Sequence, residues 1–205
     1  MNPYYWVGYN LTKLLGWIFF RLRVIHRERM INHGPVILAA NHQSFLDPPA
    51  VGSVSDRGIY YLARRTLLDG WFMGWILPKL NVIPVDSEGG RDRTALKALI
   101  RILRAGEGTV IFPEGQRTPD GQLQPAQPGL GLVVAKTLAP VVPMRIFGTY
   151  EAWPIHEKFP RPGRVTIVVG EPIRFTQEEL QGGGKDLYQQ ISQRVMDAIA
   201  ALSLE

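Results

Sequence analysis

The sequence contains no cysteine, and this absence removes several kinds of chemistry. Without thiols, the 205-residue chain cannot form disulfides, use a thiolate as nucleophile or bind zinc through cysteine. Such a composition fits a reducing compartment. The four histidines, His26, His33, His42 and His156, lack the spacing of metal ligands, so we expect no metal site.

Several other signatures are also missing. No G-x-S-x-G elbow occurs, which argues against a serine hydrolase. No glycine-rich loop follows a predicted strand as it does in nucleotide-binding proteins, so we expect no nucleotide cofactor. We find no secretory signal with a basic start and a small-residue cleavage site. A spanning helix needs ~20 predominantly apolar residues. Residues 3–20 are interrupted by Asn10, Thr12 and Lys13, so they meet this requirement only marginally.

The N-terminal stretch is instead rich in aromatic residues with basic residues behind them. Its aromatic side chains are Tyr4, Tyr5, Trp6, Tyr9, Trp17, Phe19 and Phe20, and the arginines that follow are Arg21, Arg23, Arg27 and Arg29. The whole chain carries a net charge of +5. We therefore predict an amphipathic helix that lies in one membrane leaflet with its basic end on anionic headgroups. The alternative is a helix packed on the protein's own core.

The hydrophobic pattern of the remaining chain predicts an α/β fold. The expected strands are Val36–Ala40, Ile59–Ala63, Val82–Val85, Thr109–Phe112, Val141–Phe147 and Val165–Val169. The expected helices are Pro48–Val54, Trp71–Leu77, Thr94–Leu103, Leu132–Leu138 and about Asp186 to Ala201. This alternation predicts a mixed, largely parallel sheet flanked by helices on both faces. We expect two parts: residues 1–30, a membrane-associating helical segment, and residues 31–205, the α/β domain.

Two polar clusters follow predicted strands, where the active sites of α/β proteins usually lie. The first is Asn41–Asp47, with a histidine and an aspartate five residues apart, and the second is Phe112–Thr118. His42 can act as a base near neutral pH, and a carboxylate can hold its ring in one tautomer. Because residues i and i+5 do not share a helix face, His42 and Asp47 can meet only if a turn leads into a helix. The simpler interpretations are a structural histidine and an aspartate that caps a helix.

These clusters resemble motifs of the glycerolipid acyltransferases. NHQSFLD is similar to their N-H-x-x-x-x-D motif, and FPEGQRT is similar to their F-P-E-G-x-R-[ST] motif. Two weaker blocks, Asn81–Asp86 and Val141–Gly148, resemble the second and fourth motifs and stand in the right order. The resemblance covers about residues 34–172 and points to the bacterial-type 1-acyl-sn-glycerol-3-phosphate acyltransferases.

The resemblance implies acyl transfer from a thioester to the sn-2 hydroxyl of lysophosphatidic acid, which gives phosphatidic acid. His42 would be the general base and Asp47 its orienting partner, so Ser44 is needed only for a hydrogen bond within the turn. The donor would be an acyl carrier protein thioester or an acyl-coenzyme A, with no other cofactor. We expect an enzyme on the cytoplasmic face of the membrane, peripheral or monotopic, that binds anionic lipid and no nucleic acid.

The resemblance also implies that the second cluster binds the acceptor. Glu114, Gly115 and Arg117 would contact it, with Arg117 on the phosphate. The alternative is an exposed salt bridge within that loop, which would contribute little.

The second motif departs from the family, because Ser87 stands where an arginine is usual. Arg64, Arg91 or Arg93 would then supply the charge. The departure leaves other acceptors open: glycerol 3-phosphate, another lysophospholipid or an aminolipid. A non-catalytic basic module that binds membranes or nucleic acid is a further alternative. The pairing of His42 with Asp47 argues against such a module, since a binding protein needs no base.

Two further segments have more than one interpretation. The apolar segment Trp71–Leu77 would form buried core, line an acyl groove or enter the membrane. A stripe of basic residues on the helix expected at 94–103 would be a solvated face, or a docking face for an acidic acyl carrier protein or anionic lipid. Its members are Arg93, Lys97, Arg101 and Arg104.

Overall fold

A computed structural model of the protein describes residues 2–85 and 93–204. A single sheet with the strand order β1-β7-β6-β2-β5-β3-β4 runs through the described residues. Its strands are β1 (Arg23–Ile25), β2 (Val36–Ala40), β3 (Ile59–Arg64), β4 (Val82–Val85), β5 (Gly108–Ile111), β6 (Val141–Phe147) and β7 (Thr166–Val169). Strands β6, β2, β5, β3 and β4 are mutually parallel, whereas β7 is antiparallel to β6. The predicted mixed, largely parallel sheet is confirmed.

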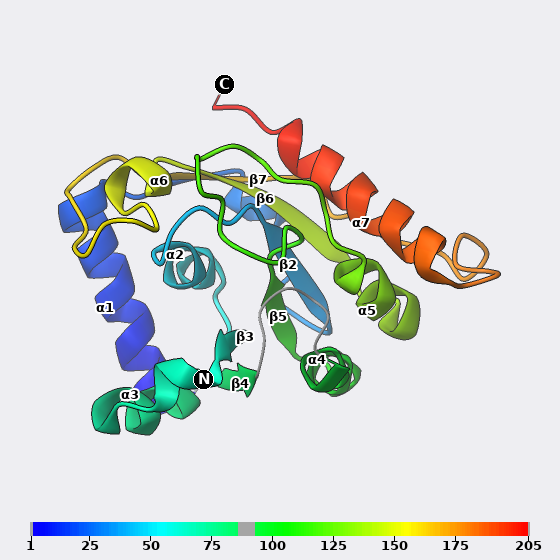
Figure 1. The fold of residues 1–205 in the computed structure, drawn as a ribbon, viewed down its shortest axis with the longest axis horizontal. Helices are drawn as coiled ribbons and strands as arrows, with labels where there is room; N and C mark the ends of the chain where they lie inside the picture. Colours follow the sequence, from blue (N-terminus) through cyan, green and yellow to red (C-terminus); the bar gives the residue numbers. More distant parts are fainter. Residues whose placement is uncertain (1, 86–92, 205) are drawn as a thin grey trace.

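Helices cover both faces of the sheet (Figure 1). Helices α4 (Arg93–Arg104), α5 (Gly129–Thr137) and α7 (Lys185–Ala200) pack on one face, and α1 (Pro3–Phe20) and α2 (Asp47–Val54) pack on the other. Alternate side chains of the fully buried strand β2 enter the two cores, with Ile37 in one and Leu38 in the other. Because both faces of this central strand are covered, its sequence is apolar at every position. The shorter elements are α3 (Trp71–Ile76), α6 (Thr149–Ala152), η1 (Arg27–Arg29), η2 (Arg65–Leu68) and η3 (Leu77–Leu80).

Strand β1 is the main element that the sequence did not predict. It has only three residues and pairs with β7 in parallel register, Val24 opposite Ile167. The expected separation of residues 1–30 from the rest stays a prediction, although part of that segment belongs to the sheet. Residues Thr176 and Glu179 form a capping box, in which the Thr176 N–H donates to the Glu179 carboxylate over 2.8 Å. The segment continues as turns rather than as a helix.

Helix α1 packs on the protein and also exposes apolar side chains. Tyr5 is 4% exposed, and its hydroxyl lies 3.0 Å from the Tyr61 hydroxyl and accepts the Ile59 N–H over 3.1 Å. Trp6 and Trp17 on the same helix are 58% and 71% exposed. In the described parts of the chain, no helix combines the length and apolar content needed to cross a membrane.

Helix α3 lies on the surface. None of its residues is buried, and Trp71 is 89% exposed. The interpretation of Trp71–Leu77 as buried core is therefore wrong. The helix stands between η2 and η3 in the connection from β3 to β4. Trp75 instead contacts α1, with its ring centroid 5.8 Å from that of Tyr4.

Candidate active site

The two polar clusters meet at one edge of the sheet. Since β2 and β5 are parallel neighbours, the loops that leave their carboxyl ends lie side by side. The His42 N–H donates to Oε1 of Glu114 over 2.7 Å, and the His42 carbonyl accepts the Thr118 N–H over 2.9 Å. These bonds hold the histidine between residues of the second cluster.

His42 and Asp47 form the predicted pair. Their Nδ1 and Oδ2 atoms lie 2.8 Å apart, and Oδ2 also accepts the N–H groups of Gln43 and Ser44 over 2.6 and 2.7 Å. Asp47 is fully buried and begins α2, so a turn does lead into a helix here. The capping interpretation of Asp47 is wrong: the cap position is Leu46, and the carboxylate bonds backwards to the turn. A proton on Nδ1 leaves Nε2 of His42 as an acceptor.

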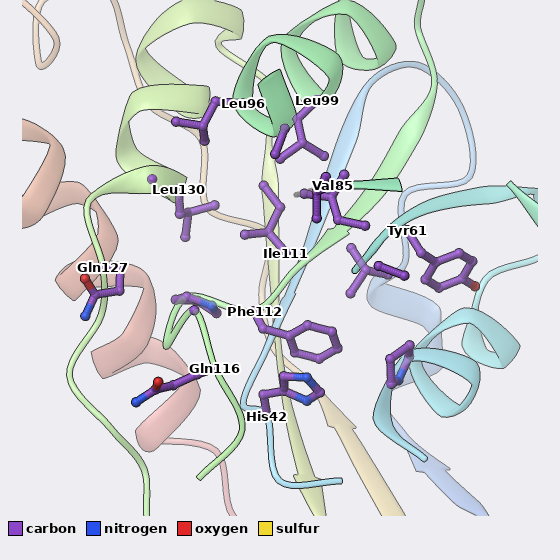
Figure 2. A pocket seen from close by; sticks show the side chains of 18 residues that line it. His42, Tyr61, Val85, Leu96, Leu99, Ile111, Phe112, Gln116, Gln127 and Leu130 are labelled. Carbon is purple, nitrogen blue, oxygen red and sulfur yellow. The ribbon is translucent and has the colours of Figure 1, made fainter. Parts of the chain in front are cut away.

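Phe112 fixes the other side of the imidazole. Its ring stacks on that of His42 with centroids 4.0 Å apart and planes 14° from parallel, an arrangement visible in Figure 2. The carboxylate of Asp47 and this stacking together hold the ring in one orientation. The sequence predicts Phe112 as the last residue of a strand and does not indicate this role. In the structure Phe112 follows β5 and precedes Pro113, so a large side chain at this junction is the one sequence signal for the contact.

The turn after β2 is anchored to neighbouring backbone. Asn41 makes two bonds with Ile146 of β6, donating to its carbonyl over 3.1 Å and accepting its N–H over 2.7 Å. Gln43 donates to the same carbonyl over 2.7 Å. The Ser44 hydroxyl donates to the Trp153 carbonyl over 2.7 Å, so it ties the turn to the residue that follows α6. These bonds hold the turn that carries His42 against β6 and the residue that follows α6.

Glu114 joins the two clusters. Its Oε1 accepts the His42 N–H, and its Oε2 accepts the Gln124 N–H over 2.8 Å. Burial raises the pKa of this carboxyl to about 7. The two backbone hydrogen bonds lower the pKa by less than burial raises it, and the nearby Asp47 raises it further. Its predicted contact with the acceptor stays a prediction. Such a contact would use lone pairs of oxygens that already accept backbone N–H groups.

This raised pKa predicts a pH-dependent stability. The folded chain holds the Glu114 proton more tightly than the unfolded chain, so the stabilisation is complete below about pH 4.5 and is lost as the pH rises to about 7. The loss should be about 3 kcal/mol in the free energy of unfolding, since one pKa unit corresponds to about 1.4 kcal/mol. Urea unfolding at about pH 4 and about pH 8 measures it. Glu114→Gln, which cannot ionise, should lack this component, whereas the exposed control Glu151→Gln should retain it. Equal losses in wild type and Glu114→Gln would contradict the assignment.

Arg117 lies over an aromatic ring of the first cluster. Its guanidinium carbon is 3.6 Å from the ring centroid of Phe45, a cation–π contact. Gly115 precedes it with φ of +75°, a left-handed conformation that favours glycine and turns the loop. The guanidinium is thereby placed beside the turn that carries His42.

The other predicted arginines are less closely defined. Arg64 is exposed at the end of β3, on the same edge of the sheet as the two clusters. Arg91 lies outside the described residues. Arg93 is the first residue of α4, and its side chain is likewise outside what the structure describes. Their roles in replacing the charge absent at Ser87 stay predictions.

An apolar cavity of about 140 Å³ lies beside the histidine (Figure 2). We call it the His42 cavity. Its lining comes from β3, β4, α4, β5 and α5 and includes Tyr61, Val85, Leu99, Ile111 and Leu130. His42 and Gly115 belong to the same lining. A base beside an apolar chamber suits an acyl chain whose reactive carbonyl stays near the imidazole. In the described residues, no group of three or more histidine or carboxylate side chains is placed to hold a metal ion.

Comparisons with known proteins agree with this geometry. A sequence profile of the family described as Acyltransferase matches residues 21–147. Two relatives are named 1-acyl-sn-glycerol-3-phosphate acyltransferase. The chloroplastic BAT2 of Brassica napus is 29% identical over 148 residues, which are 71% of this chain and 43% of that protein. The Bacillus subtilis relative is 26% identical over 165 residues, 80% of this chain and 79% of that protein. The chain thus spans less than half of BAT2.

A solved structure is also similar. The crystal structure of PlsC, the 1-acyl-sn-glycerophosphate acyltransferase of Thermotoga maritima, superposes with a TM-score of 0.76 at 26% identity. The match covers 98% of this chain and 81% of that protein. The profile match includes both polar clusters, and the folds agree along nearly the whole chain. The chain belongs to the acyltransferase family.

Proposed function

We propose that the protein transfers a fatty acyl group from a thioester to the sn-2 hydroxyl of lysophosphatidic acid and so forms phosphatidic acid. The observation that carries this proposal is the bond of 2.8 Å between His42 and the buried Asp47 beside an apolar cavity. The names of the relatives support the same acceptor.

The chemistry follows from the positions of these groups. Nε2 of His42 accepts the proton of the acceptor hydroxyl while the hydroxyl oxygen attacks the thioester carbonyl. Asp47 holds the ring and stabilises the imidazolium. The tetrahedral intermediate then expels the thiolate, which takes the proton back from His42. The substrate supplies the nucleophile, so the bonded hydroxyl of Ser44 needs no chemical role.

We place the donor's acyl chain in the His42 cavity, whose lining is mostly apolar, with the carrier outside. Lys97, Arg101 and Arg104 are exposed on α4, as a docking face for an acidic acyl carrier protein requires. A solvated basic face that accepts acyl-coenzyme A is the alternative. The reaction needs no cofactor beyond the donor.

A panel of acceptors tests the proposed reaction. The purified protein is given one acyl thioester and, separately, 1-acyl-glycerol 3-phosphate, glycerol 3-phosphate, lysophosphatidylcholine and an aminolipid, with products identified by mass spectrometry. The proposal predicts phosphatidic acid from the first acceptor at the highest kcat/KM. A higher kcat/KM for another acceptor would show that this other lipid is the preferred acceptor. No product from any acceptor would favour a binding module.

Arg117→Ala should raise the KM for the phosphate-bearing acceptor far more than the KM for the donor. Removing one partner of a buried charge pair costs roughly 2–5 kcal/mol, or about 30-fold to several thousandfold in KM. Arg64→Ala, Arg91→Ala and Arg93→Ala belong in the same series, because the variant that reproduces the effect supplies the charge absent at Ser87. Equal effects of Arg117→Ala on both substrates would indicate a structural role instead.

We also propose that the enzyme lies on the cytoplasmic face of the membrane, as a peripheral or monotopic protein, through α1 and α3. Exposed apolar side chains on both helices support this, and they meet where Trp75 contacts Tyr4. The ammonium of Lys79 lies 3.3 Å from the Trp75 ring centroid, which places a cation at the same surface. Aromatic and basic groups together suit an anionic headgroup layer.

Substituting exposed residues of α1 tests membrane binding better than truncation, because removing residues 1–23 would also remove Tyr5 and part of β1. The triple variant Leu14→Ser, Trp17→Ser and Ile18→Ser should lower binding to anionic liposomes by more than about tenfold, since burying each large side chain contributes up to roughly 2 kcal/mol. Co-sedimentation measures this. The exposed control Leu204→Ser should bind normally. A triple variant that sediments like the wild type would exclude α1 as the anchor.

A further inference from the structure

A second apolar cavity, of about 320 Å³, lies between α1, α2 and β3. We call it the α1–α2 cavity. Its lining includes Gly8 and Thr12 of α1, Gly52 of α2, Leu67 of η2, Leu77 of η3 and Phe45 of the first polar cluster. The acyl transfer derived above, with one donor chain in the His42 cavity, leaves this space unused.

The two cavities share a wall. Pro48, Tyr61, Leu62 and Ala63 line both of them. The hydroxyl of Tyr61 lies 3.0 Å from that of Tyr5, and a Cβ at Gly52 would collide with it. This wall is thus fixed by a hydrogen bond and by the absence of a side chain at position 52. The structure therefore has two separate apolar chambers beside one histidine loop.

The contact between Arg117 and Phe45 indicates which chain belongs in which chamber. Phe45 lines the α1–α2 cavity but not the His42 cavity, and the guanidinium of Arg117 lies 3.6 Å from its ring centroid. A phosphate bound to Arg117 therefore lies over the wall of the α1–α2 cavity. The α1–α2 cavity is then the apolar space next to the tail of that same molecule. The acyl chain of the donor thioester, whose carbonyl must reach His42, is assigned to the His42 cavity.

We propose that the α1–α2 cavity binds the acyl chain that the acceptor already carries. This inference rests on the proposed function, and it adds a binding site for the acceptor's tail. Because α1 forms one wall of the cavity and exposes apolar side chains outside, the tail can pass along this helix from a lipid layer to the site. The acceptor then binds with its phosphate, hydroxyl and tail all held by the protein.

Filling the cavity tests the proposal. The variant Thr12→Phe with Leu67→Phe places two rings in the α1–α2 cavity from positions that are not fully buried. Acceptors with tails of six, eight and ten carbons are assayed as monomers without bilayers. In the wild type, KM should fall with tail length by up to about fourfold per methylene buried. The filled variant should raise the KM for the ten-carbon acceptor roughly tenfold or more, since two displaced methylenes account for that. Its KM for the six-carbon acceptor and its preference among donor chain lengths should not change.

Two controls make the result specific. Leu204→Phe adds a ring at an exposed position outside the lining of both cavities and should keep the wild-type dependence on tail length. Ala95→Leu narrows the His42 cavity alone and should shift the donor preference to shorter chains without affecting the acceptor tail. If the double variant is unstable by circular dichroism, Thr12→Phe alone should give a smaller effect in the same direction.

The outcomes separate this inference from the proposed function. An unchanged dependence on tail length in the filled variant, or a changed donor preference, would overturn the assignment of the cavity. If the wild type still transfers an acyl group to the six-carbon acceptor, the proposed acyl transfer holds although the assignment of the cavity fails. If the wild type transfers to no acceptor, calorimetry with the ten-carbon acceptor alone still decides: weaker binding to the filled variant supports the site, and equal binding overturns it.

Discussion

His42→Ala is expected to lower kcat for acyl transfer by ~10²–10⁴-fold, the range that loss of a general base produces. The fold should survive, because the backbone N–H and carbonyl of residue 42 keep their bonds to Glu114 and Thr118. Initial rates with saturating donor and acceptor measure the loss, and circular dichroism checks the fold. His33→Ala, at an exposed position, should behave like the wild type. A His42→Ala protein that keeps more than about a tenth of the wild-type kcat would contradict a base at this position.

Asp47→Asn should lower kcat by on the order of 10²- to 10³-fold, since removing one charge of a buried pair costs about 3–5 kcal/mol. One oxygen, Oδ2, accepts from Nδ1 of His42 and from two backbone N–H groups, so an asparagine oxygen in this place retains all three bonds. The tautomer of His42 is then preserved, and the loss comes from the missing negative charge.

The same substitution should also reduce stability. Among the described residues, no group bonds to Oδ1 of Asp47, so the amide nitrogen of asparagine would be buried there without an acceptor. This costs about 1–3 kcal/mol in the free energy of unfolding. Asp47→Ala should be less stable still, because two buried N–H groups lose their acceptor. The measurements are kcat and urea unfolding of both variants. An Asp47→Asn protein with at least half the wild-type kcat would contradict the role of the charge.

The sheet and the contact between His42 and Asp47 were predictable because their signals are local. Strand β2 is apolar at every position, as a strand covered on both faces must be, and His42 follows at its end. Parallel strands then bring the second cluster to the same edge. The five-residue spacing also required a turn before α2, which the structure contains.

The rest depended on contacts between distant parts of the chain. The two bonds of Glu114 go to backbone N–H groups, and no residue type marks such a partner. The stacking of Phe112 on His42 and of Arg117 over Phe45 joins two loops about seventy residues apart. The sequence left burial and exposure of α3 both open, because an apolar segment has the same pattern on a surface that meets lipid as in a protein core.

In the proposed mechanism the acyl group passes directly from the thioester to the acceptor hydroxyl, with His42 as base. This is tested by mixing the purified protein with a ¹³C-labelled acyl thioester and 1-acyl-glycerol 3-phosphate. The masses of the lipid products and of the intact protein are then followed by mass spectrometry over a single turnover. We expect labelled phosphatidic acid with the label at sn-2 and an unchanged protein mass at every time point. Label bound covalently to the protein, or labelled phosphatidic acid formed equally fast by His42→Ala, would contradict it.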